Sequence, residues 1–280
     1  MGKILLVDGS NLLFQMFFGM PARIVNAQGK AIQGTMGFTG ALLRMIRMTK
    51  PTHIGVFFDG EHFNERTAID AEYKANRTDY SQVEEEDSPF SQLSDVYAAL
   101  DFLGIPHAET THCETDDWMA AYALVCGQEH EIVIASFDSD FIQLVTDSVS
   151  VLRYRGQKTI LCDPAWIRNK VGVEPAQYAD DNALVGDTSD NLKGADKIGP
   201  KTAAALLRQF GTLENILFKS ALITKPSVRA SVIEHTDRLL RNQKLIRLKG
   251  DVPLPFAPDE LVYPDRQMTT NEVLKGIHLK

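Results

Sequence analysis

The chain has 280 residues, of which 44% are hydrophobic and 24% are charged, and its formal net charge is −8. This is the composition of a folded globular protein with a sizeable core, and no window offers the roughly 20 consecutive apolar residues that a membrane helix needs. The three cysteines, Cys113, Cys126 and Cys162, are far apart and not in a metal-binding spacing, so we expect reduced thiols in a cytoplasmic protein.

The net negative charge argues by itself against a nucleic-acid partner, because phosphate binding usually requires a surplus of basic residues. The argument weakens if the acidic residues are concentrated in one place. Nine of the 37 acids are expected at a single site, and the remaining acids are then nearly equal in number to the 29 bases. Composition therefore leaves the question of a DNA partner open.

The first two thirds of the chain alternate strand-like and helix-like runs, the pattern of a parallel sheet with crossover helices. Short apolar runs predict buried strands at residues 4–7, 54–58 and 132–135. Apolar residues at helical spacing predict helices at residues 37–48, 91–103 and 116–125. Val149 and Val151 alternate with polar residues, as in an edge strand. These elements predict an α/β domain over residues 1–162.

Two later parts of the chain have a different character. Residues 60–90 are polar and lack a sustained apolar period, so we expect an exposed, mobile insertion within the α/β domain. Residues 163–250 are expected to be mainly helical, with a helix that ends at Gly186 and, after a glycine-rich turn, another that begins at Pro200. The tail, residues 251–280, contains several prolines and is expected to be extended.

Acidic residues follow each of the three predicted buried strands. The carboxyl ends of parallel strands lie at one edge of a sheet, where ligands bind. Asp8, Asp59 and the pair Asp138 and Asp140 stand at those ends. Three further acids surround the start of the helix predicted at residues 116–125. Two more lie three residues apart in the glycine-rich turn between the two later helices. The full set is Asp8, Asp59, Glu114, Asp116, Asp117, Asp138, Asp140, Asp187 and Asp190.

Any one of these acids, taken alone, is more often a turn residue or a helix cap. Gathered at one edge without cations, they would repel one another and their pKa values would rise. Carboxylate oxygens with no Cys or His partner suit Mg²⁺ or Mn²⁺, and two such ions about 4 Å apart activate water and stabilise the leaving oxygen of a phosphodiester. We therefore predict a two-metal phosphate-cleaving site, with Asp8 and Asp138 among its catalytic residues.

The glycine-rich turn lies directly before a predicted helix. Free backbone N–H groups at a helix start, with Lys201 beside them, form a phosphate cradle, although a plain connection between helices is the alternative. The residues expected to contact DNA here are Gly194, Lys197, Ile198, Gly199, Lys201 and Thr202.

The insertion carries two cations three residues apart, Lys74 and Arg77, next to Tyr73. Such charged residues more commonly lie on a solvent-exposed surface and bind nothing. If the insertion lies over the metal ions, Lys74 and Arg77 hold the scissile phosphate and take part in catalysis, while a neighbouring base stacks on Tyr73.

The order and spacing of these motifs resemble the 5′-nuclease (flap endonuclease) family, in the bacterial and phage branch that includes the 5′-nuclease domain of DNA polymerase I. No polymerase region follows, so the chain resembles the free-standing form. The matching segments are residues 6–9, 58–59, 73–77, 114–117, 138–140 with 143–144, 186–191 and 198–203.

The resemblance implies a PIN-like α/β fold, with a mostly parallel sheet flanked by helices, joined to a helix-three-turn-helix DNA-binding region over residues 163–250. It implies that the insertion forms an arch through which a 5′ single strand passes. It also implies two groups of metal ligands: Asp8, Asp59, Glu114 and Asp116 near one ion, and Asp138, Asp140, Asp187 and Asp190 near the other, with Asp117 assisting.

The resemblance further implies that the turn from Gly194 to Gly199 holds duplex DNA together with a K⁺ ion. Two lysines depart from the family's pattern there, since Lys193 and Lys197 stand where Pro and Gly are usual. Lys197 in particular bears on whether K⁺ binds, because it can alter the carbonyl geometry of the turn or add a phosphate contact. Phe137 is a third departure, because it replaces a common Gly.

The implied activity is hydrolysis of DNA at 5′ ends and flap junctions, as a 5′-3′ exonuclease and flap endonuclease in replication, repair and primer removal. The expected partners are DNA with 5′ single-stranded flaps or ends and, as a second class, RNA/DNA hybrids. We expect a monomer, not bound to a membrane, in the cytoplasm of a bacterial or phage-infected cell. Two alternatives stay open: a non-catalytic module that binds branched DNA, and a PIN-like ribonuclease, against which residues 194–203 argue.

Overall fold

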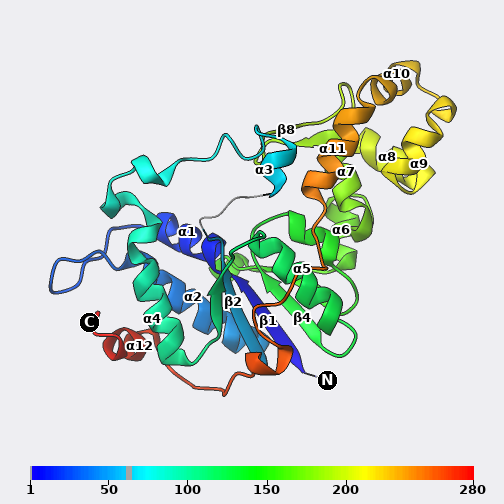
Figure 1. The fold of residues 1–280 in the computed structure, drawn as a ribbon. Helices are drawn as coiled ribbons and strands as arrows, with labels where there is room; N and C mark the ends of the chain where they lie inside the picture. Colours follow the sequence, from blue (N-terminus) through cyan, green and yellow to red (C-terminus); the bar gives the residue numbers. More distant parts are fainter. Residues whose placement is uncertain (1, 61–64) are drawn as a thin grey trace.

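A six-stranded sheet forms the centre of the first part of the chain (Figure 1). The computed structural model describes residues 2–60 and 65–280. The strand order is β3-β2-β1-β4-β5-β6, and all neighbouring pairs are parallel except β5 with β6. The strands are β1 (Lys3–Asp8), β2 (His53–Phe58), β3 (His107–Glu109), β4 (Glu131–Ala135), β5 (Val149–Arg153) and β6 (Ile160–Cys162). The predicted mostly parallel sheet and its three buried strands are confirmed.

The prediction of an edge strand at Val149 and Val151 is wrong. β5 pairs with β4 on one side and with β6 on the other, so β6 forms the edge of the sheet. β6 has only three residues, which is too short for a periodic pattern to reveal it in the sequence.

Helices cover both faces of this sheet because successive side chains of β1 point to opposite sides. Leu5 and Val7 pack in one apolar cluster, and Ile4 and Leu6 pack in another. The first cluster includes residues of α1 (Gly9–Gly19), α2 (Gln33–Thr49) and α4 (Leu93–Leu103), and the second includes residues of α5 (Thr115–Cys126) and α6 (Pro164–Lys170).

A separate group of helices shares a third apolar cluster and projects to one side of the sheet (Figure 1). These helices are α7 (Tyr178–Val185), α8 (Pro200–Phe210), α9 (Leu213–Phe218), α10 (Pro226–Glu234) and α11 (Thr236–Ile246). The helix predicted to begin at Pro200 does so, and Gly211 follows its end with a φ of 88°. Between α7 and α8, two short strands, β7 (Gly186–Asp187) and β8 (Leu192–Lys193), pair with each other.

The insertion crosses over the carboxyl edge of the sheet from α3 (Glu65–Ile69) to α4 (Figure 1). Besides α3 it contains short 3₁₀ turns at Tyr80–Gln82, Glu85–Asp87 and Pro89–Gln92. The prediction that it is exposed is wrong at Arg66 and Tyr73, whose exposed fractions are both 3%. Tyr73 packs in the cluster of the C-terminal helices, so its ring is not available here to stack on a base. Residues 61–64 of the predicted insertion lie outside the described residues.

The prediction of an extended C-terminal tail is wrong for α12 (Thr270–Gly276), which packs against α2 and α4. Thr269 and Glu272 cap this helix reciprocally, and Val273 and Leu274 are buried. The capping pair is visible in the sequence, but the prolines that precede it favour an extended segment. In the part of the chain that the structure describes, no helix has the length and apolar character to cross a bilayer.

Two adjacent carboxylates of α7 differ in their environment. Asp180 accepts hydrogen bonds from the backbone N–H of Leu213 at 3.0 Å and from Gln243 at 2.6 Å. Asp181 is also buried, but its Oδ1 has no hydrogen-bond partner, and burial raises the pKa of Asp181 from 3.8 to about 6. Because the folded protein then binds more protons than the unfolded chain between these two values, stability falls as pH rises through that window.

We therefore expect Asp181→Asn to stabilise the protein. At about pH 8 its free energy of unfolding should exceed that of the wild type by about 2 kcal/mol, and the difference should shrink towards pH 4. Urea unfolding at both pH values measures this. Asp180→Asn is the matched control and should lose stability, because an amide cannot replace both acceptor oxygens. Equal or lower stability of Asp181→Asn at pH 8 would contradict the prediction.

Candidate active site

Asp8, at the end of β1, is both a helix cap and a member of an acidic cluster. Its side chain accepts hydrogen bonds from the backbone N–H of Asn11 at 2.9 Å and from Ser136 Oγ at 2.8 Å. Burial and the charges of Asp59 and Asp138 raise the pKa of Asp8 to about 7. Asp8 therefore caps α1, as a single Asp before a helix often does, and also belongs to the acidic cluster.

Five of the nine acids line one cavity of about 650 Å³ at the carboxyl edge of the sheet: Asp8, Asp59, Glu114, Asp116 and Asp138. Asp59 follows β2, and its Oδ1 accepts the backbone N–H of Thr115 at 3.0 Å, which ties the end of β2 to the start of α5. Burial, followed by the charge of Asp138, raises the pKa of Asp116 well above its usual value. The strand ends thus meet at one edge, as the parallel sheet predicts.

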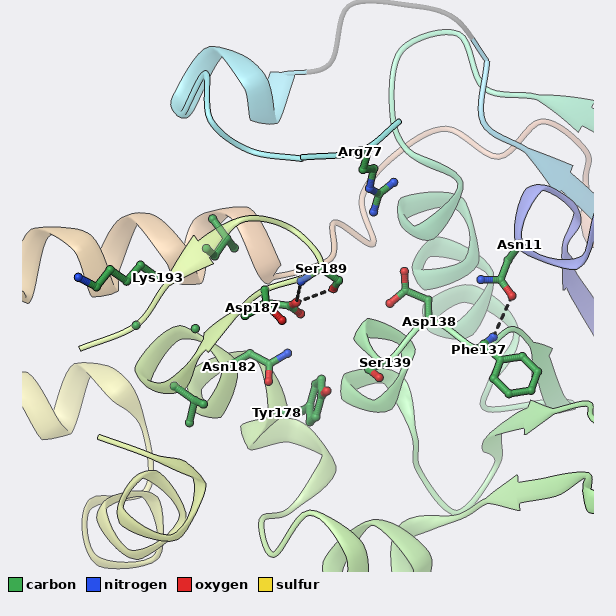
Figure 2. A pocket seen from close by; sticks show the side chains of 15 residues that line it. Asn11, Arg77, Phe137, Asp138, Ser139, Tyr178, Asn182, Asp187, Ser189 and Lys193 are labelled. Atoms are coloured by element: carbon green, nitrogen blue, oxygen red, sulfur yellow. Dashed lines mark hydrogen bonds between the residues drawn. The ribbon is translucent and has the colours of Figure 1, made fainter. Parts of the chain in front are cut away.

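A second cavity of about 730 Å³ continues from the first towards the C-terminal helices (Figure 2). Asp138 stands on one wall and Asp187 on the other, with Arg77 above them. Asp187 Oδ1 accepts hydrogen bonds from the backbone N–H and the hydroxyl of Ser189, at 2.8 and 2.5 Å. Asn11, Arg77 and Asp138 line both cavities, so the two are continuous at these residues.

Asp140 and Asp190 are buried and line neither of these cavities. Burial raises the pKa of Asp140 well above its usual value, and the charges of Asp138, Asp190 and Asp187 raise it further. The charges of Asp138, Asp187 and Asp190 therefore act on Asp140, the fourth acid that the resemblance assigns to a second ion. Asp140 Oδ1 is buried and has no hydrogen-bond partner.

The cations of the insertion reach into the acidic cluster from above. Lys74 Nζ lies 2.9 Å from Glu114 Oε1, and Arg77 Nη2 lies 2.9 Å from Asp190 Oδ1. The Lys74 ammonium also lies 4.9 Å from the centre of the Tyr73 ring. Two positive charges from one segment therefore face the cavity in which a phosphate would meet the acids.

Asp117, like Asp140 and Asp190, lines neither of the two cavities. It is 1% exposed, and Arg66 binds both of its carboxylate oxygens at 2.9 and 2.8 Å. Arg66 Nη1 also lies 3.0 Å from Glu114 Oε2, and its Nε donates to the carbonyl of Leu245 at 2.9 Å. Asp117 thus forms a buried ion pair with Arg66, and its assistance at a metal ion stays a prediction.

Sequence reasoning missed Arg66, because a single arginine in a polar stretch gives no local sign of burial. It also missed Asn11 and Ser136, which orient the ends of β1 and β4. Asn11 accepts the backbone N–H of Phe137 at 3.1 Å, and Ser136 Oγ accepts that of Asp138 at 3.0 Å. Asn11 stands three residues after Asp8 and Ser136 two residues before Asp138, so their position was the available signal.

The predicted DNA-binding residues of the glycine-rich turn differ in exposure. Lys197, Gly199 and Lys201 are exposed and Thr202 is half-buried, whereas the Ile198 side chain is buried. A Cβ on Gly194 would lie 2.4 Å from the carbonyl oxygen of Leu184, so glycine is required here for close packing against α7. Gly199 precedes α8 with Pro200, which has no N–H, as its first residue, and the carbonyl of Gly199 accepts the backbone N–H groups of Thr202 and Ala203 at 2.9 and 3.0 Å.

The donor set suits hard divalent cations. It consists of carboxylates with raised pKa values, at Asp8, Asp116, Asp138 and Asp140, and includes the buried, unpaired Oδ1 of Asp140. Within residues 2–60 and 65–280, however, no group of three or more Asp, Glu, His or Cys side chains already surrounds a position for a metal ion. The residues present therefore fit Mg²⁺ or Mn²⁺ by chemistry, while the side chains need to rearrange to surround an ion.

Two family models match this chain. The 5′-3′ exonuclease N-terminal resolvase-like domain matches residues 3–172, and the 5′-3′ exonuclease C-terminal SAM fold matches residues 173–269. The chain belongs to the 5′-3′ exonuclease family, whose members are metal-dependent nucleases. The resemblance stated from the sequence motifs and the expected fold class are confirmed.

Among curated proteins, the chain is 34% identical over 267 residues to the thermostable DNA polymerase I of Thermus thermophilus. That alignment covers 95% of this chain and 31% of the relative, so the chain spans about a third of its length. The fold is similar to that of a T5 protein co-crystallised with metal ions, with a TM-score of 0.73 at 23% identity, covering 87% of this chain and 88% of that one. It is also similar to the bacteriophage T5 flap endonuclease in a complex with DNA and metal ions, with a TM-score of 0.72 at 21% identity, covering 99% and 98%.

Proposed function

We propose that this chain is a structure-specific 5′-nuclease that hydrolyses DNA phosphodiesters at 5′ ends and flap junctions, in replication, repair and primer removal. The observation that carries the proposal is the cavity in which five acids, from the ends of three strands and the start of α5, lie beneath Lys74 and Arg77. Membership of the 5′-3′ exonuclease family supports it. DNA is the proposed partner, with RNA/DNA hybrids as a second substrate class and a monomer as the active form.

In this proposal, the acids bind the metal ions and the basic residues of the insertion bind the DNA phosphate. Two groups of acids would hold Mg²⁺ or Mn²⁺: Asp8, Asp59, Glu114 and Asp116 in one, and Asp138, Asp140, Asp187 and Asp190 in the other. Bound there, these ions supply an activated water and positive charge for the leaving oxygen. Lys74 and Arg77 bind the scissile phosphate from the opposite side, and their charges offset the negative charge of the substrate. Ser136 and Asn11 fix the carboxylate of Asp8 and the backbone before Asp138.

A 5′-flap substrate with a label at its 5′ end tests the proposal. In Mg²⁺ or Mn²⁺ we expect a product cut near the junction, and in EDTA we expect none. Full cleavage in EDTA would contradict a metal-dependent mechanism. Junction binding without product in either metal would favour the non-catalytic module, and preferential cleavage of an RNA flap would favour the ribonuclease.

Lys74→Ala is expected to lower kcat by about a hundredfold or more, because it removes a charge from a preorganised, water-poor site. Binding of the flap substrate should weaken by less than about tenfold, since a single phosphate contact makes up a small part of the total affinity. Single-turnover cleavage with enzyme in excess separates the two quantities. Lys170→Ala, an exposed lysine at the end of α6, is the matched control and should cleave at the wild-type rate.

A further inference from the structure

Carbonyl oxygens in the first half of the turn, and the one that precedes it, are directed at donors within the protein. Arg238 Nη1 donates to the carbonyl of Gly194 at 3.1 Å, and Ser231 Oγ donates to that of Asp196. The carbonyl of Ala195 accepts the backbone N–H of Ile198 at 3.3 Å. Asn242 donates to the preceding carbonyl, that of Lys193, at 3.0 Å. The carbonyls of four consecutive residues, 193–196, therefore each accept a hydrogen bond from the chain itself.

Positive side chains also surround this turn. Arg238 projects from α11 onto the Gly194 carbonyl, and Lys193 Nζ lies 3.7 Å from the Asp196 carboxylate. His235 lies on the same carboxylate, with its Nε2 at 3.5 Å from Asp196 Oδ2. Lys197 takes a left-handed backbone conformation, with a φ of 64°, and its side chain is exposed. The carboxylate of Asp196 is thus already paired with basic groups.

This arrangement does not fit the K⁺ ion that the resemblance implies. A K⁺ ion replaces its hydration shell with several carbonyl oxygens that face a common point. Here the carbonyl oxygens of residues 193–196 each face an N–H or O–H donor instead. The guanidinium of Arg238 remains charged at all physiological pH values, so it repels a second cation at the same carbonyl.

We propose that Arg238 supplies the positive charge and the carbonyl contact that a monovalent metal ion would supply at the turn, so that duplex binding by this chain does not depend on K⁺. Ser231 and Asn242 fix the neighbouring carbonyls, while the side chains of Lys197 and Lys201 stay exposed for contact with a DNA phosphate. This inference rests on the proposed binding of DNA and specifies the ion dependence of that same site.

Equilibrium binding of a fluorescent DNA duplex in EDTA tests the inference in the wild-type protein. The measurement is made in KCl, NaCl and tetramethylammonium chloride at equal ionic strength, because salt concentration alone changes phosphate binding. We expect dissociation constants that agree within about twofold. Binding that is tenfold tighter in KCl than in the other salts overturns the inference but leaves the proposed function intact. Absence of duplex binding in all three salts rejects the proposed function, and the inference with it.

Arg238→Met keeps an unbranched apolar stem in place of the aliphatic part of the side chain but removes its charge and its donors. We expect duplex binding to weaken by about tenfold in NaCl and in tetramethylammonium chloride, the loss of one charged hydrogen bond. Arg238→Lys should retain most of the affinity. Arg229→Met is the matched control, since Arg229 lies on α10 and donates to the carbonyl of Ala221, away from the turn. Unchanged binding by Arg238→Met in all salts overturns the inference.

A crystal soaked in rubidium chloride provides a readout that does not depend on DNA. Rb⁺ resembles K⁺ and is located by its anomalous scattering. We expect no anomalous peak at the turn of the wild-type protein. A peak coordinated by the carbonyls of residues 193–196 would show that a metal ion and Arg238 occupy the turn together, which contradicts the proposed substitution.

Discussion

Asp138→Ala is expected to reduce cleavage of a 5′-flap substrate by about a thousandfold or more, which corresponds to about 4 kcal/mol of transition-state stabilisation. Asp138 lines both cavities, and its charge raises the pKa of Asp8, Asp116 and Asp140. Asp138 therefore lies where the two proposed groups of metal ligands meet. Duplex binding should stay within about threefold of the wild type, because the contacts at the turn are unchanged.

Single-turnover rates and anisotropy on the same substrate measure these two quantities. Asp101→Ala is the control, since Asp101 is an exposed acid on α4, remote from the cavities. An equal loss of binding and of cleavage by Asp138→Ala would show that the residue acts in DNA binding or folding, and it would contradict the assignment to catalysis.

Arg66→Met is expected to lower the free energy of unfolding by about 3–5 kcal/mol. Arg66 is 3% exposed and joins three segments: the insertion, the start of α5 through Asp117 and Glu114, and the end of α11 through the carbonyl of Leu245. Its loss leaves the Asp117 carboxylate buried without its main counter-charge. Chemical unfolding at neutral pH measures the effect.

The double variant Arg66→Met with Asp117→Leu tests whether the loss of stability comes from the broken ion pair or from other contacts of Arg66. It leaves no buried charge unpaired, so it should recover at least half of the lost stability. A loss below about 1 kcal/mol for Arg66→Met, or no recovery in the double variant, would show that the ion pair does not carry the stability assigned to it.

The sequence was most informative where the spacing of apolar residues, and the residues that begin or end an element, agree with the fold. The strands that end at Asp8, Phe58 and Ala135 could be predicted because each is a short apolar run that leads directly into polar residues. Their meeting at one edge then follows from parallel pairing alone. The bounds of α8 were predictable for a related reason, since proline begins it and glycine follows it.

The remaining features depend on contacts between segments distant in the sequence. Tyr73 and Arg66 are buried by helices more than a hundred residues away, and a polar stretch gives no local sign of this. Asp116 and Asp117 could not be told apart for a different reason. Adjacent residues of a helix point about 100° apart, so only one of the two faces the cavity, and the packing of α5 decides which.

Titration of the metal-free protein with Mn²⁺, followed by electron paramagnetic resonance, tests most directly whether the gathered acids hold divalent ions. We predict two bound ions per chain when a duplex with a 5′ flap is present, with affinity at least about tenfold weaker in Asp138→Ala and in Asp187→Ala but unchanged in Asp101→Ala. Binding of no Mn²⁺ by the wild type, or equal binding by the wild type and Asp138→Ala, would contradict the account.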